Sequence, residues 1–589
     1  MLKRVVRICA LILAAGVPSA RGAIPSSERQ VLLNLYASTN GAGWIHRAGW
    51  NGAAGTECSW YGVACDDAAA HVIQLDLDSD NLAGTLPSIA GLSSIEYCIL
   101  SNNRLTGSIP AVSSLTHLRI LELYANGLTG AIPSLSGLSR LTTLELNSNR
   151  LTGAIPSLAD LTSMQVFDLD TNDLTGAVPD LSAMTDLQYI ALDTNGLSGP
   201  VPSLSALTQL SDCELYDNDF SGPVPSLSGL SNLRILLLSN NRLSGSFPDP
   251  TGTSLETLDL DYNALSGPIP SSVGNAKTLR NLFLAGNDLV GALPSSLSGL
   301  TNLAAGGSDF RYNGLYTTSA SLASFLDARQ EGGDWQSTQT IAPSGVSAGS
   351  ETNNAVRVAW TPIAYGSDAG SYDIWFATAS TGPWSLAGST SDKTQSSFTA
   401  AGLKPSTAYW LMVRTTTDPG TNNANAVTSG DGPPVAAATT ACGTCALAPT
   451  SATLEGTSPF PPTPSEPNGI LEPGETVAFA PSWENVSSGS VASVTGTLSG
   501  FSGPNDGTAA YTIVHGSAGY GTLAAGSTGS CASDPYEIGV SADVRPAVHW
   551  DASVDERLST GEVHTWVLHV GASFTDVDPS SGFYPFVET

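Results

Sequence analysis

The sequence predicts a mostly β protein: a solenoid of about eleven turns with a parallel concave sheet, followed by two β-sandwich domains. A 23-residue period fills the first half of the chain, and short alternating strands follow from about residue 343. Charged residues make up only 13% of the sequence, against about 25% in average proteins, whereas Gly (60) and Pro (36) are abundant. This composition excludes helical bundles rich in Glu, Lys and Arg. The hydrophobic content of 41% is enough to bury cores, so wholesale disorder is excluded too.

The charge balance and the N-terminus bear on compartment and partners. There are 22 Lys and Arg against 52 Asp and Glu, a net charge of −30, which disfavours nucleic acid and anionic membrane surfaces as partners. Basic residues precede an apolar run over residues 8–17, and Ala20 and Gly22 suit cleavage before Ala23, so residues 1–22 read as a signal peptide. The run is too short to span a bilayer. We therefore expect a secreted or cell-surface protein without membrane insertion, free to form disulfides.

The period is set by an Asn, once Asp, that recurs with seven gaps of 23 residues, followed by gaps of 22, 24 and 26. L-x-L precedes this position, and x-L-x-G-x-I-P follows it. The full string, L-x-x-L-x-L-x-x-N-x-L-x-G-x-I-P, resembles the plant-type leucine-rich repeat, and the resemblance implies repeats over residues 73–316. The recurring positions are Asp80, Asn103, Asn126, Asn149, Asn172, Asn195, Asn218, Asn241, Asn263, Asn287 and Asn313.

Strand geometry assigns a place to each repeat position. Alternate strand residues face opposite ways, so both leucines of L-x-L enter the core and the residue between them faces the concave surface. The Asn side chains are expected to stack inside the turns and to hydrogen-bond backbone groups left unpaired by the bend. The Gly-x-x-Pro spacing excludes a plain helix on the convex side.

The ends of a solenoid need caps. Ser27 and Gln30 have the spacing of a capping box, which predicts a helix start. The C-x-W-x-G-V-x-C segment that follows resembles the N-terminal cap of plant-type leucine-rich proteins. That resemblance implies a cap over residues 23–72 and a disulfide between Cys58 and Cys65.

The other end of the array and its unpaired cysteines also carry predictions. A helix near residues 321–329 and Trp335 predict a closing cap over residues 317–342. Cys98 and Cys213 replace core leucines five turns apart, roughly 24 Å at ~4.8 Å per strand. A disulfide needs Cα atoms within about 7 Å, so both are expected to be buried free thiols.

Two further modules are predicted after the array. The L-x-P-x-T-x-Y corner over residues 403–409 resembles a fibronectin type III domain. The resemblance implies a sandwich over residues 343–441 in which the Tyr409 hydroxyl turns back onto the backbone. Residues 442–572 are predicted to form a second sandwich.

The last part of the chain leaves several alternatives. The pairing of Cys442, Cys445 and Cys531 stays open. Residues 468–475 resemble a turn motif that opens sandwich modules of secreted bacterial proteins, and a structural turn is favoured there over a calcium loop. Residues 573–589 resemble the opening of an S-layer homology module, which implies a truncated segment whose intact form would tether the chain to a cell envelope.

The concave positions suggest a binding surface. Seven of the eleven residues between the paired leucines are acidic, and a second column stands two residues on. Like charges about 5 Å apart on neighbouring strands repel by roughly 0.8 kcal/mol in water. A cationic partner would relieve that repulsion, either a basic peptide or protein surface or calcium held by side-chain oxygens. The predicted ligand-binding residues are the acidic patch, Glu122, Glu145, Asp168, Asp170 and Asp193, with Tyr124 and Tyr216 beside it.

These observations predict a non-catalytic recognition or adhesion protein that binds a protein, peptide or glycan on the concave face. An acidic surface without a ligand would carry the same acids on the convex face, which instead reads Ser, Thr, Gly and Pro. A structural cell-envelope component is the first alternative. A carbohydrate-active enzyme is the second and is disfavoured, because a glycosidase needs two carboxyl groups across a cleft. No catalytic residue and no cofactor other than calcium is predicted.

Overall fold

The computed structural model describes residues 23–404, 406–440, 446–454, 471, 474, 476–503, 510–541 and 549–571. The chain divides into two compact units, residues 1–336 and 337–589. Among the described residues, the first unit holds one continuous hydrophobic core and the second holds two. The predicted signal peptide, Cys442, Cys445, most of the turn motif and residues 573–589 lie outside the described residues.

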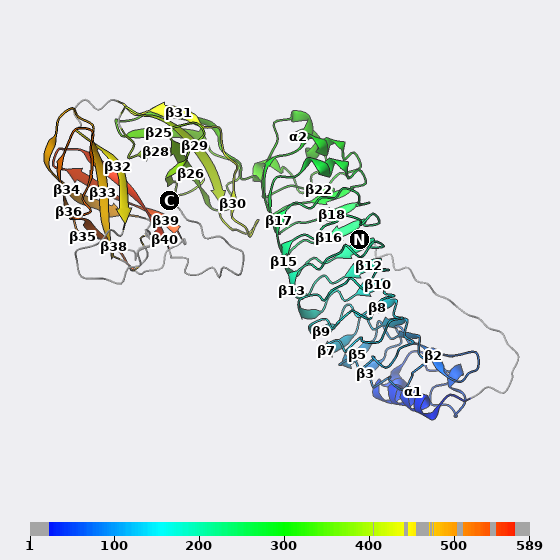
Figure 1. Ribbon diagram of the computed structural model, residues 1–589. Helices are drawn as coiled ribbons and strands as arrows, with labels where there is room; N and C mark the ends of the chain where they lie inside the picture. Colours follow the sequence, from blue (N-terminus) through cyan, green and yellow to red (C-terminus); the bar gives the residue numbers. More distant parts are fainter. Residues whose placement is uncertain are drawn as a thin grey trace. The chain divides into compact units, whose positions relative to one another are not determined.

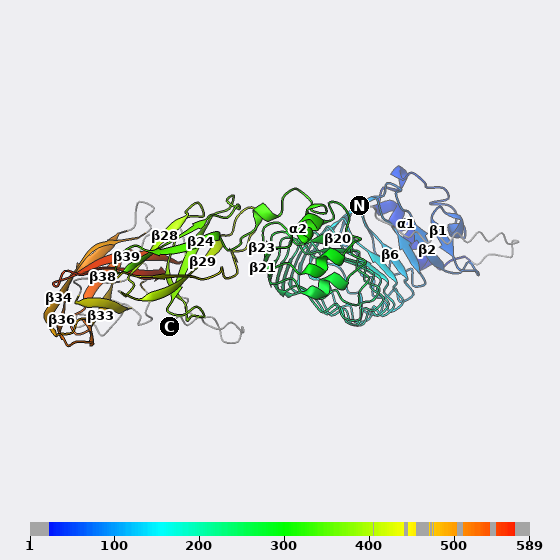
Figure 2. The ribbon, with the colours of Figure 1, turned by 90° about the horizontal axis from the view of Figure 1, so that it is seen from above.

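The first unit is a solenoid whose inner wall is a sheet of twelve strands (Figures 1 and 2). The first strand pairs antiparallel with the second, and the others follow in parallel, one per turn. In order, they are β1 (Val63–Cys65), β2 (Val72–Asp76), β4 (Tyr97–Ile99), β6 (Ile120–Glu122), β8 (Thr143–Glu145), β10 (Val166–Asp168), β12 (Tyr189–Ala191), β14 (Asp212–Glu214), β16 (Ile235–Leu237), β18 (Thr257–Asp259), β20 (Asn281–Phe283) and β22 (Ser308–Asp309). The predicted fold class is therefore confirmed.

A second sheet of eleven parallel strands runs along the other side of the turns, where the sequence predicted only the absence of a plain helix. It is built from the L-x-G segment after each Asn. Its strands are β3 (Ala83–Thr85), β5 (Arg104–Gly107), β7 (Gly127–Gly130), β9 (Arg150–Gly153), β11 (Asp173–Gly176), β13 (Gly196–Pro200), β15 (Asp219–Pro223), β17 (Arg242–Ser246), β19 (Ala264–Gly267), β21 (Asp288–Ala292) and β23 (Gly314–Tyr316). Short 3₁₀ turns follow later strands: η3 (Ser271–Asn275) and η4 (Ser295–Gly299).

Two left-handed backbone positions bend each turn between the sheets. Thr171, directly before the recurring Asn of its turn, has φ 51°, and Gly153 in the L-x-G segment has φ 79°. The left-handed region is strained for residues with a Cβ, which explains why the second position is Gly in turn after turn. The leucines of each turn point into the space between the sheets, as Leu144 and Leu169 do with no exposed surface.

The Asn side chains form the predicted ladder. Asn172 donates through Nδ2 to the carbonyl oxygens of Leu146, Leu169 and Asp170, each at 3.1 Å. Its Oδ1 accepts from the Leu151 backbone N–H at 2.9 Å. One buried amide thus satisfies four backbone groups on adjoining turns. The same pattern of three donated bonds recurs at Asn103, Asn126, Asn149, Asn195, Asn218, Asn241, Asn263, Asn287 and Asn313.

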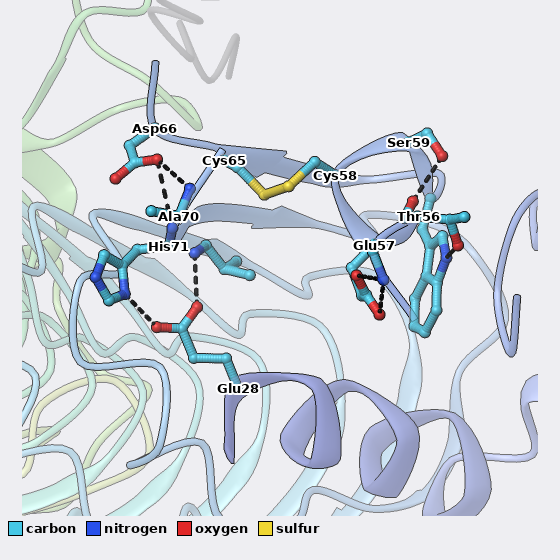
Figure 3. The surroundings of a disulfide bond; sticks show 12 residues. Glu28, Thr56, Glu57, Cys58, Ser59, Cys65, Asp66, Ala70 and His71 are labelled. Carbon is cyan, nitrogen blue, oxygen red and sulfur yellow. Dashed lines mark hydrogen bonds and ion pairs between the residues drawn. A yellow bond between two sulfur atoms is a disulfide. The ribbon is translucent and has the colours of Figure 1, made fainter. Parts of the chain in front are cut away.

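The N-terminal cap is α1 (Ser26–Ser38), η1 (Gly41–Gly43), η2 (Glu57–Ser59) and strand β1. Cys58 and Cys65 are disulfide-bonded with Cα atoms 5.5 Å apart (Figure 3). The capping-box prediction is wrong, because Pro25 is the N-cap and no side chain caps the helix. Glu28 of α1 is buried and instead holds the backbone N–H of Val72 at 2.8 Å.

The C-terminal end of the solenoid is closed by α2 (Ala320–Asp327), near the predicted helix, and by η5 (Gln336–Thr338). Trp335 is fully buried, and its indole N–H donates to Asp327 Oδ1 at 3.0 Å. Cys98 and Cys213 are buried free thiols, as predicted. No helix within the described ranges combines the length and apolar character needed to cross a membrane.

The second unit begins with a β-sandwich. Its two sheets have the orders β24-β25-β28 and β27-β26-β29-β30, with β31 also paired to β29. The Tyr409 hydroxyl accepts a hydrogen bond from the backbone N–H of Lys404 at 2.9 Å, so the predicted tyrosine corner is present. The strands are β24 (Ser344–Ser350), β25 (Ala355–Thr361), β26 (Gly370–Ala377), β27 (Ser385–Ser389), β28 (Ser397–Ala401), β29 (Ala408–Thr417), β30 (Val427–Thr428) and β31 (Val435–Ala438).

A second sandwich follows, with sheet orders β32-β33-β38-β35 and β36-β34-β39-β40, and β37 paired to β33. Glu556 is fully buried in its core and accepts from the Trp483 and Trp566 indoles at 3.0 and 2.8 Å. The Tyr520 and Tyr536 hydroxyls donate to its other oxygen. The strands are β32 (Leu447–Leu454), β33 (Thr476–Asn485), β34 (Val491–Ser502), β35 (Tyr511–His515), β36 (Ser517–Leu523), β37 (Thr528–Ser530), β38 (Tyr536–Val540), β39 (His549–Leu558) and β40 (Val563–Gly571).

Candidate ligand-binding site on the concave sheet

The parallel register places the first acidic column in one line across the inner sheet. Glu122 pairs with Glu145, and Glu145 pairs with Asp168. Asp168 in turn pairs with Ala191, and Ala191 pairs with Glu214 on the next turn. A small side chain therefore interrupts the line of acids between Asp168 and Glu214.

The second column lies beside the first, just after each strand. The backbone N–H of Ser148 donates to the Asp170 carbonyl at 2.9 Å, and Thr171 donates to the Asp193 carbonyl at 3.0 Å. On the next turn, the backbone N–H of Thr194 donates to the Tyr216 carbonyl, also at 3.0 Å. The second column thus runs through successive turns as Tyr124, Asn147, Asp170, Asp193 and Tyr216.

Burial separates the predicted site residues into two groups. Asp168, Asp170 and Asp193 are only 8%, 5% and 3% exposed, although they lie on an open sheet. Glu122, Glu145 and the two tyrosines are partly exposed. Tyr124 and Tyr216 are four turns apart, about 19 Å at ~4.8 Å per strand, so they flank the patch and do not share one pocket. The structure brings Asp168, Asp170, Asp193 and Tyr216 together.

The aspartates of the first column also have a local structural function. Asp168 Oδ1 accepts a hydrogen bond from the Asp170 backbone N–H at 3.1 Å, which fixes the chain as it leaves the strand. The same contact, from the backbone N–H two residues on, recurs at Asp76, Asp259 and Asp309. Part of the acidity of this column is therefore explained without a ligand.

Tyr189 is a member of this cluster that sequence reasoning missed. It lies on β12, two residues before Ala191, and alternate strand residues share a face. Burial raises the pKa of Tyr189 far above its usual value, and nearby carboxylates raise it further. Those carboxylates belong to Asp168, Glu214, Asp170 and Asp193. The signal was available, because the residue two places before each column position faces the same side.

Asp193 is the most buried acid of the patch. Its Oδ2 accepts from Thr194 Oγ1 at 3.3 Å, and its carboxylate is hydrogen-bonded to the Tyr216 hydroxyl. Burial raises the pKa of Asp193, the Tyr216 hydrogen bond opposes that shift, and the charge of Asp170 adds to it. Asp193 Oδ1 and Asn147 Oδ1 are buried without a hydrogen-bond partner. Buried polar atoms are almost always satisfied in proteins, so these two oxygens require an explanation.

The calcium prediction finds no supporting geometry. Among the residues that the structure describes, no three His, Cys, Asp or Glu side chains are grouped closely enough to hold a metal ion. Calcium takes six to eight oxygens at about 2.3–2.6 Å, a far tighter shell than neighbouring strands provide.

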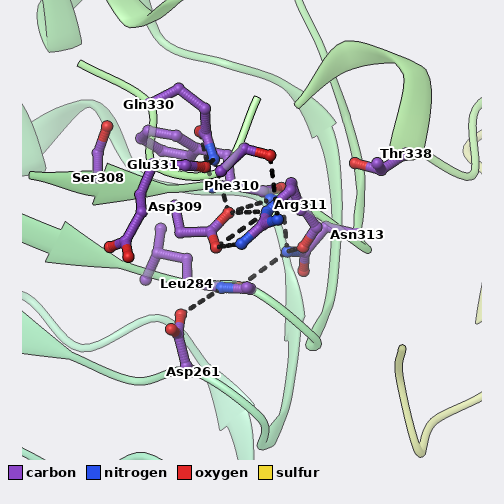
Figure 4. Close-up of polar contacts among 12 residues, drawn as sticks. Asp261, Leu284, Ser308, Asp309, Phe310, Arg311, Asn313, Gln330, Glu331 and Thr338 are labelled. Atoms are coloured by element: carbon purple, nitrogen blue, oxygen red, sulfur yellow. Dashed lines mark hydrogen bonds and ion pairs between the residues drawn. The ribbon is translucent and has the colours of Figure 1, made fainter. Parts of the chain in front are cut away.

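A second acidic group lies at the C-terminal end of the inner sheet (Figure 4). Asp309 forms an ion pair with Arg311 and accepts from Gln330 Nε2 at 2.7 Å. Asp261 Oδ1 accepts from the Ala285 backbone N–H at 2.5 Å. Burial, followed by the charges of Asp259 and Asp309, raises the pKa of Asp261 to about 8. Here the chain supplies its own cation, because Arg311 forms an ion pair with Asp309.

Comparison with solved structures finds receptors and a plant ice-binding protein among the similar chains. The chain is 37% identical to a TDR receptor over 44% of this chain and 46% of that chain, with a TM-score of 0.40. It is 33% identical to the plant peptide hormone receptor RGFR1, solved in complex with RGF2, over 41% and 44% of the two chains, with a TM-score of 0.37. A plant ice-binding protein is 25% identical over 46% and 90%, with a TM-score of 0.38. The chain spans less than half of either receptor.

Family models match three parts of the chain. The leucine rich repeat N-terminal domain matches residues 25–66, and the leucine rich repeat matches residues 232–253 and 254–276. The fibronectin type III domain matches residues 341–431. The chain therefore combines an N-terminal leucine-rich-repeat cap and leucine-rich repeats with a fibronectin type III domain.

Proposed function

We propose that this chain is a non-catalytic recognition protein that binds a peptide or protein ligand on the concave sheet of its solenoid. The observation that carries the proposal is the burial of Asp168, Asp170 and Asp193 next to one another on an otherwise open sheet. Carboxylates held this close together repel one another, and burial strengthens that repulsion. A binding partner that supplies positive charge would offset this repulsion. The outer sheet instead carries charges of both signs at its exposed strand starts, as at Arg150 and Asp173.

The flanking tyrosines support a macromolecular ligand over a small one. Tyr124 and Tyr216 bracket about 19 Å of the inner sheet, a length that an extended peptide of about six residues covers. Tyrosine gives a large, rigid contact surface with a polar tip, which suits protein and peptide interfaces. A glycan remains the alternative occupant, because sugar rings also stack on tyrosine faces.

We infer an extracellular setting for this binding. The Cys58–Cys65 disulfide of the cap requires an oxidising compartment in most organisms, and it agrees with the signal peptide predicted from residues 1–22. The fibronectin type III domain and the second sandwich would then act as spacers. A structural envelope function is the competing proposal, and it predicts no saturable ligand on the inner sheet.

Site-specific photo-crosslinking tests the proposal. A random peptide library is first selected on the full chain, and the best peptide is labelled with biotin. Benzoylphenylalanine is then placed at Tyr124 on the inner sheet or at Thr129, an exposed position of the outer sheet in the same turn. Both variants carry the same photoreactive group, so its position is the only difference between them.

The expected result is a crosslink to the selected peptide from position 124 that excess unlabelled peptide suppresses, with little product from position 129. Equal or stronger crosslinking from position 129 would move the binding surface to the outer sheet. If the selection yields no peptide that binds saturably and a glycan array yields a glycan that does, the ligand is a glycan and not a peptide.

A further inference from the structure

The acidic side chains converge around Ala191. Asp168 and Glu214 pair with Ala191 on the preceding and following turns. Tyr189 and Asp193 lie two residues before and after it, on the same face. We call these four residues, together with Asp170, the Ala191 cluster. The charges of all four acidic members raise the pKa of Tyr189, so these carboxylates lie near its side chain.

Two unpartnered oxygens beside this cluster point to a missing hydrogen-bond donor. Asp193 Oδ1 and Asn147 Oδ1 have no hydrogen-bond partner, and the two residues are only 3% and 7% exposed. Asn147 is neutral, so its orphaned oxygen is an observation independent of the acidity. Both residues stand in the second column, on either side of Asp170. Backbone hydrogen bonds hold these successive turns next to one another. A ligand that inserts donors between these turns would satisfy them.

The spacing of the turns selects the kind of donor. An ammonium nitrogen with acceptors at about 2.8 Å in a tetrahedral arrangement places those acceptors about 4.6 Å apart. Neighbouring strands lie about 4.7–4.9 Å apart, so side chains on adjacent turns meet this requirement without moving the backbone. Calcium would need adjacent oxygens about 3.4 Å apart or closer. In the described part of the chain, no three acidic or imidazole groups approach a metal-holding arrangement.

Because one oxygen of Asp193 already accepts a hydrogen bond, the site favours an ammonium ligand over a guanidinium. Asp193 Oδ2 already accepts from Thr194 Oγ1 at 3.3 Å, which leaves Oδ1 for a ligand. A guanidinium binds best to both oxygens of one carboxylate in a planar fork. An ammonium is a compact charge with three donors, and it suits single oxygens supplied by different residues.

We propose that the Ala191 cluster binds the primary ammonium group of a lysine side chain in the ligand, between Asp170, Asp193 and Glu214. The Tyr189 ring lies against the ammonium and adds a cation–π contact. Asn147 lies one turn before Asp170, and its Oδ1 accepts a hydrogen bond from a backbone N–H of the ligand. This assignment rests on the proposed function, because it places the lysine within a ligand bound along the inner sheet.

Fluorescence anisotropy with defined probes tests the assignment on the full chain in 150 mM NaCl. Three fluorescein-labelled peptides are compared, each with four repeats of a basic or modified residue followed by serine. The first carries lysine, the second arginine, and the third Nε-acetyl-lysine. The protein variants are Asp193→Asn and Glu214→Gln, and Asp173→Asn serves as the control, since it removes the same charge from an exposed position of the outer sheet.

We expect the lysine peptide to bind at least fivefold more tightly than the arginine peptide and at least tenfold more tightly than the acetylated one. Asp193→Asn and Glu214→Gln should each weaken the lysine peptide about tenfold, and Asp173→Asn less than twofold. Circular dichroism and melting curves establish that each variant is folded. Glu214→Gln removes a partly exposed charge, so it keeps the test usable if Asp193→Asn misfolds.

Other outcomes overturn the assignment in distinguishable ways. Equal binding of the lysine and arginine peptides would exclude an ammonium-selective site and leave the acidic recognition surface in place. If Asp193→Asn and Asp173→Asn weaken binding of the lysine peptide equally, the peptide responds to the net charge of the protein and not to a site at Asp193. No binding of the lysine peptide at 1 mM would also overturn the assignment. The crosslinking of independently selected peptides then tests the proposed function separately from this assignment.

Discussion

The carboxylate of Asp168 accepts a hydrogen bond from the backbone N–H of Asp170 at 3.1 Å. One acid of the patch therefore positions the strand exit that presents the next acid. The two side chains have different functions in this account: Asp168 caps the strand end and adds charge, and Asp170 stands in the second column beside Asp193. Recognition and fold maintenance overlap at this point of the sheet.

Replacing Asp168 separates its hydrogen bond from its charge. Asp168→Asn keeps an oxygen that can accept the Asp170 N–H, whereas Asp168→Ala leaves that N–H without its acceptor. We expect Asp168→Ala to be less stable than Asp168→Asn by about 1 kcal/mol. Urea unfolding monitored by circular dichroism measures the difference. Equal stabilities would show that the contact contributes nothing.

The Asn ladder should be the most sensitive polar feature of the solenoid. Asn172→Ala removes three donated hydrogen bonds and one accepted bond from a buried site. A loss of about 2–4 kcal/mol is expected, because the carbonyls stay buried without donors. Asn232→Ala is the matched control, since Asn232 is exposed and donates to the Thr208 carbonyl of the preceding turn at 2.9 Å. Similar losses for the two variants in thermal unfolding would contradict the structural function of the ladder.

The period and the ladder were predictable from sequence, but the second sheet was not. A regular Asn after L-x-L specifies both the strand and the buried turn, because only a side chain with a donor and an acceptor serves the backbone there. The L-x-G segment of the second sheet reads as a turn, since Gly and Pro are poor strand formers. Its strands form because the first sheet already aligns successive turns in register.

The candidate site was predictable in part. The acids of the two columns follow directly from repeat positions, and the register places them side by side. Their burial does not follow from the pattern, because it depends on how neighbouring side chains such as Tyr189 lean across the sheet. The capping-box prediction was wrong because it also depended on packing that the pattern does not show. Pro25 is the N-cap and has no side-chain acceptor, and Glu28 accepts from the Val72 backbone N–H on β2.

Stability should fall as pH rises because of Asp261. The folded-state pKa of about 8 lies above the usual value near 4, so between these pH values the folded protein holds a proton that the unfolded chain releases. The protonated form is the stable one, and ionisation above pH 8 places a buried charge beside Asp259 and Asp309. Asp261→Asn should therefore stabilise the protein more at pH 9 than at pH 5, by at least about 1 kcal/mol. Urea unfolding at both pH values measures this, and an equal effect at both would rule out the raised pKa.

The N-terminal cap should depend on its disulfide. Cys58 and Cys65 close a loop with a sequence separation of 7, for which loop entropy gives about 2–3 kcal/mol. Replacing both by Ala should lower the unfolding midpoint of the cap by a corresponding amount. Hydrogen exchange of peptides from residues 23–72, followed by mass spectrometry as urea is raised, reports on this region, where Trp44, Trp50 and Trp60 pack against one another. Unchanged cap unfolding in the double variant would show that the α1 contacts alone hold the cap.

The binding account depends most on the acids of the inner sheet, and one affinity comparison tests it directly. A triple variant of the inner sheet combines Glu145→Gln, Asp170→Asn and Asp193→Asn. A triple variant of the outer surface combines Asp160→Asn, Asp173→Asn and Asp180→Asn, all exposed, and changes the net charge equally. The account predicts that the dissociation constant of a selected peptide rises at least a hundredfold in the first variant and less than threefold in the second. Equal changes in the two folded variants would contradict it.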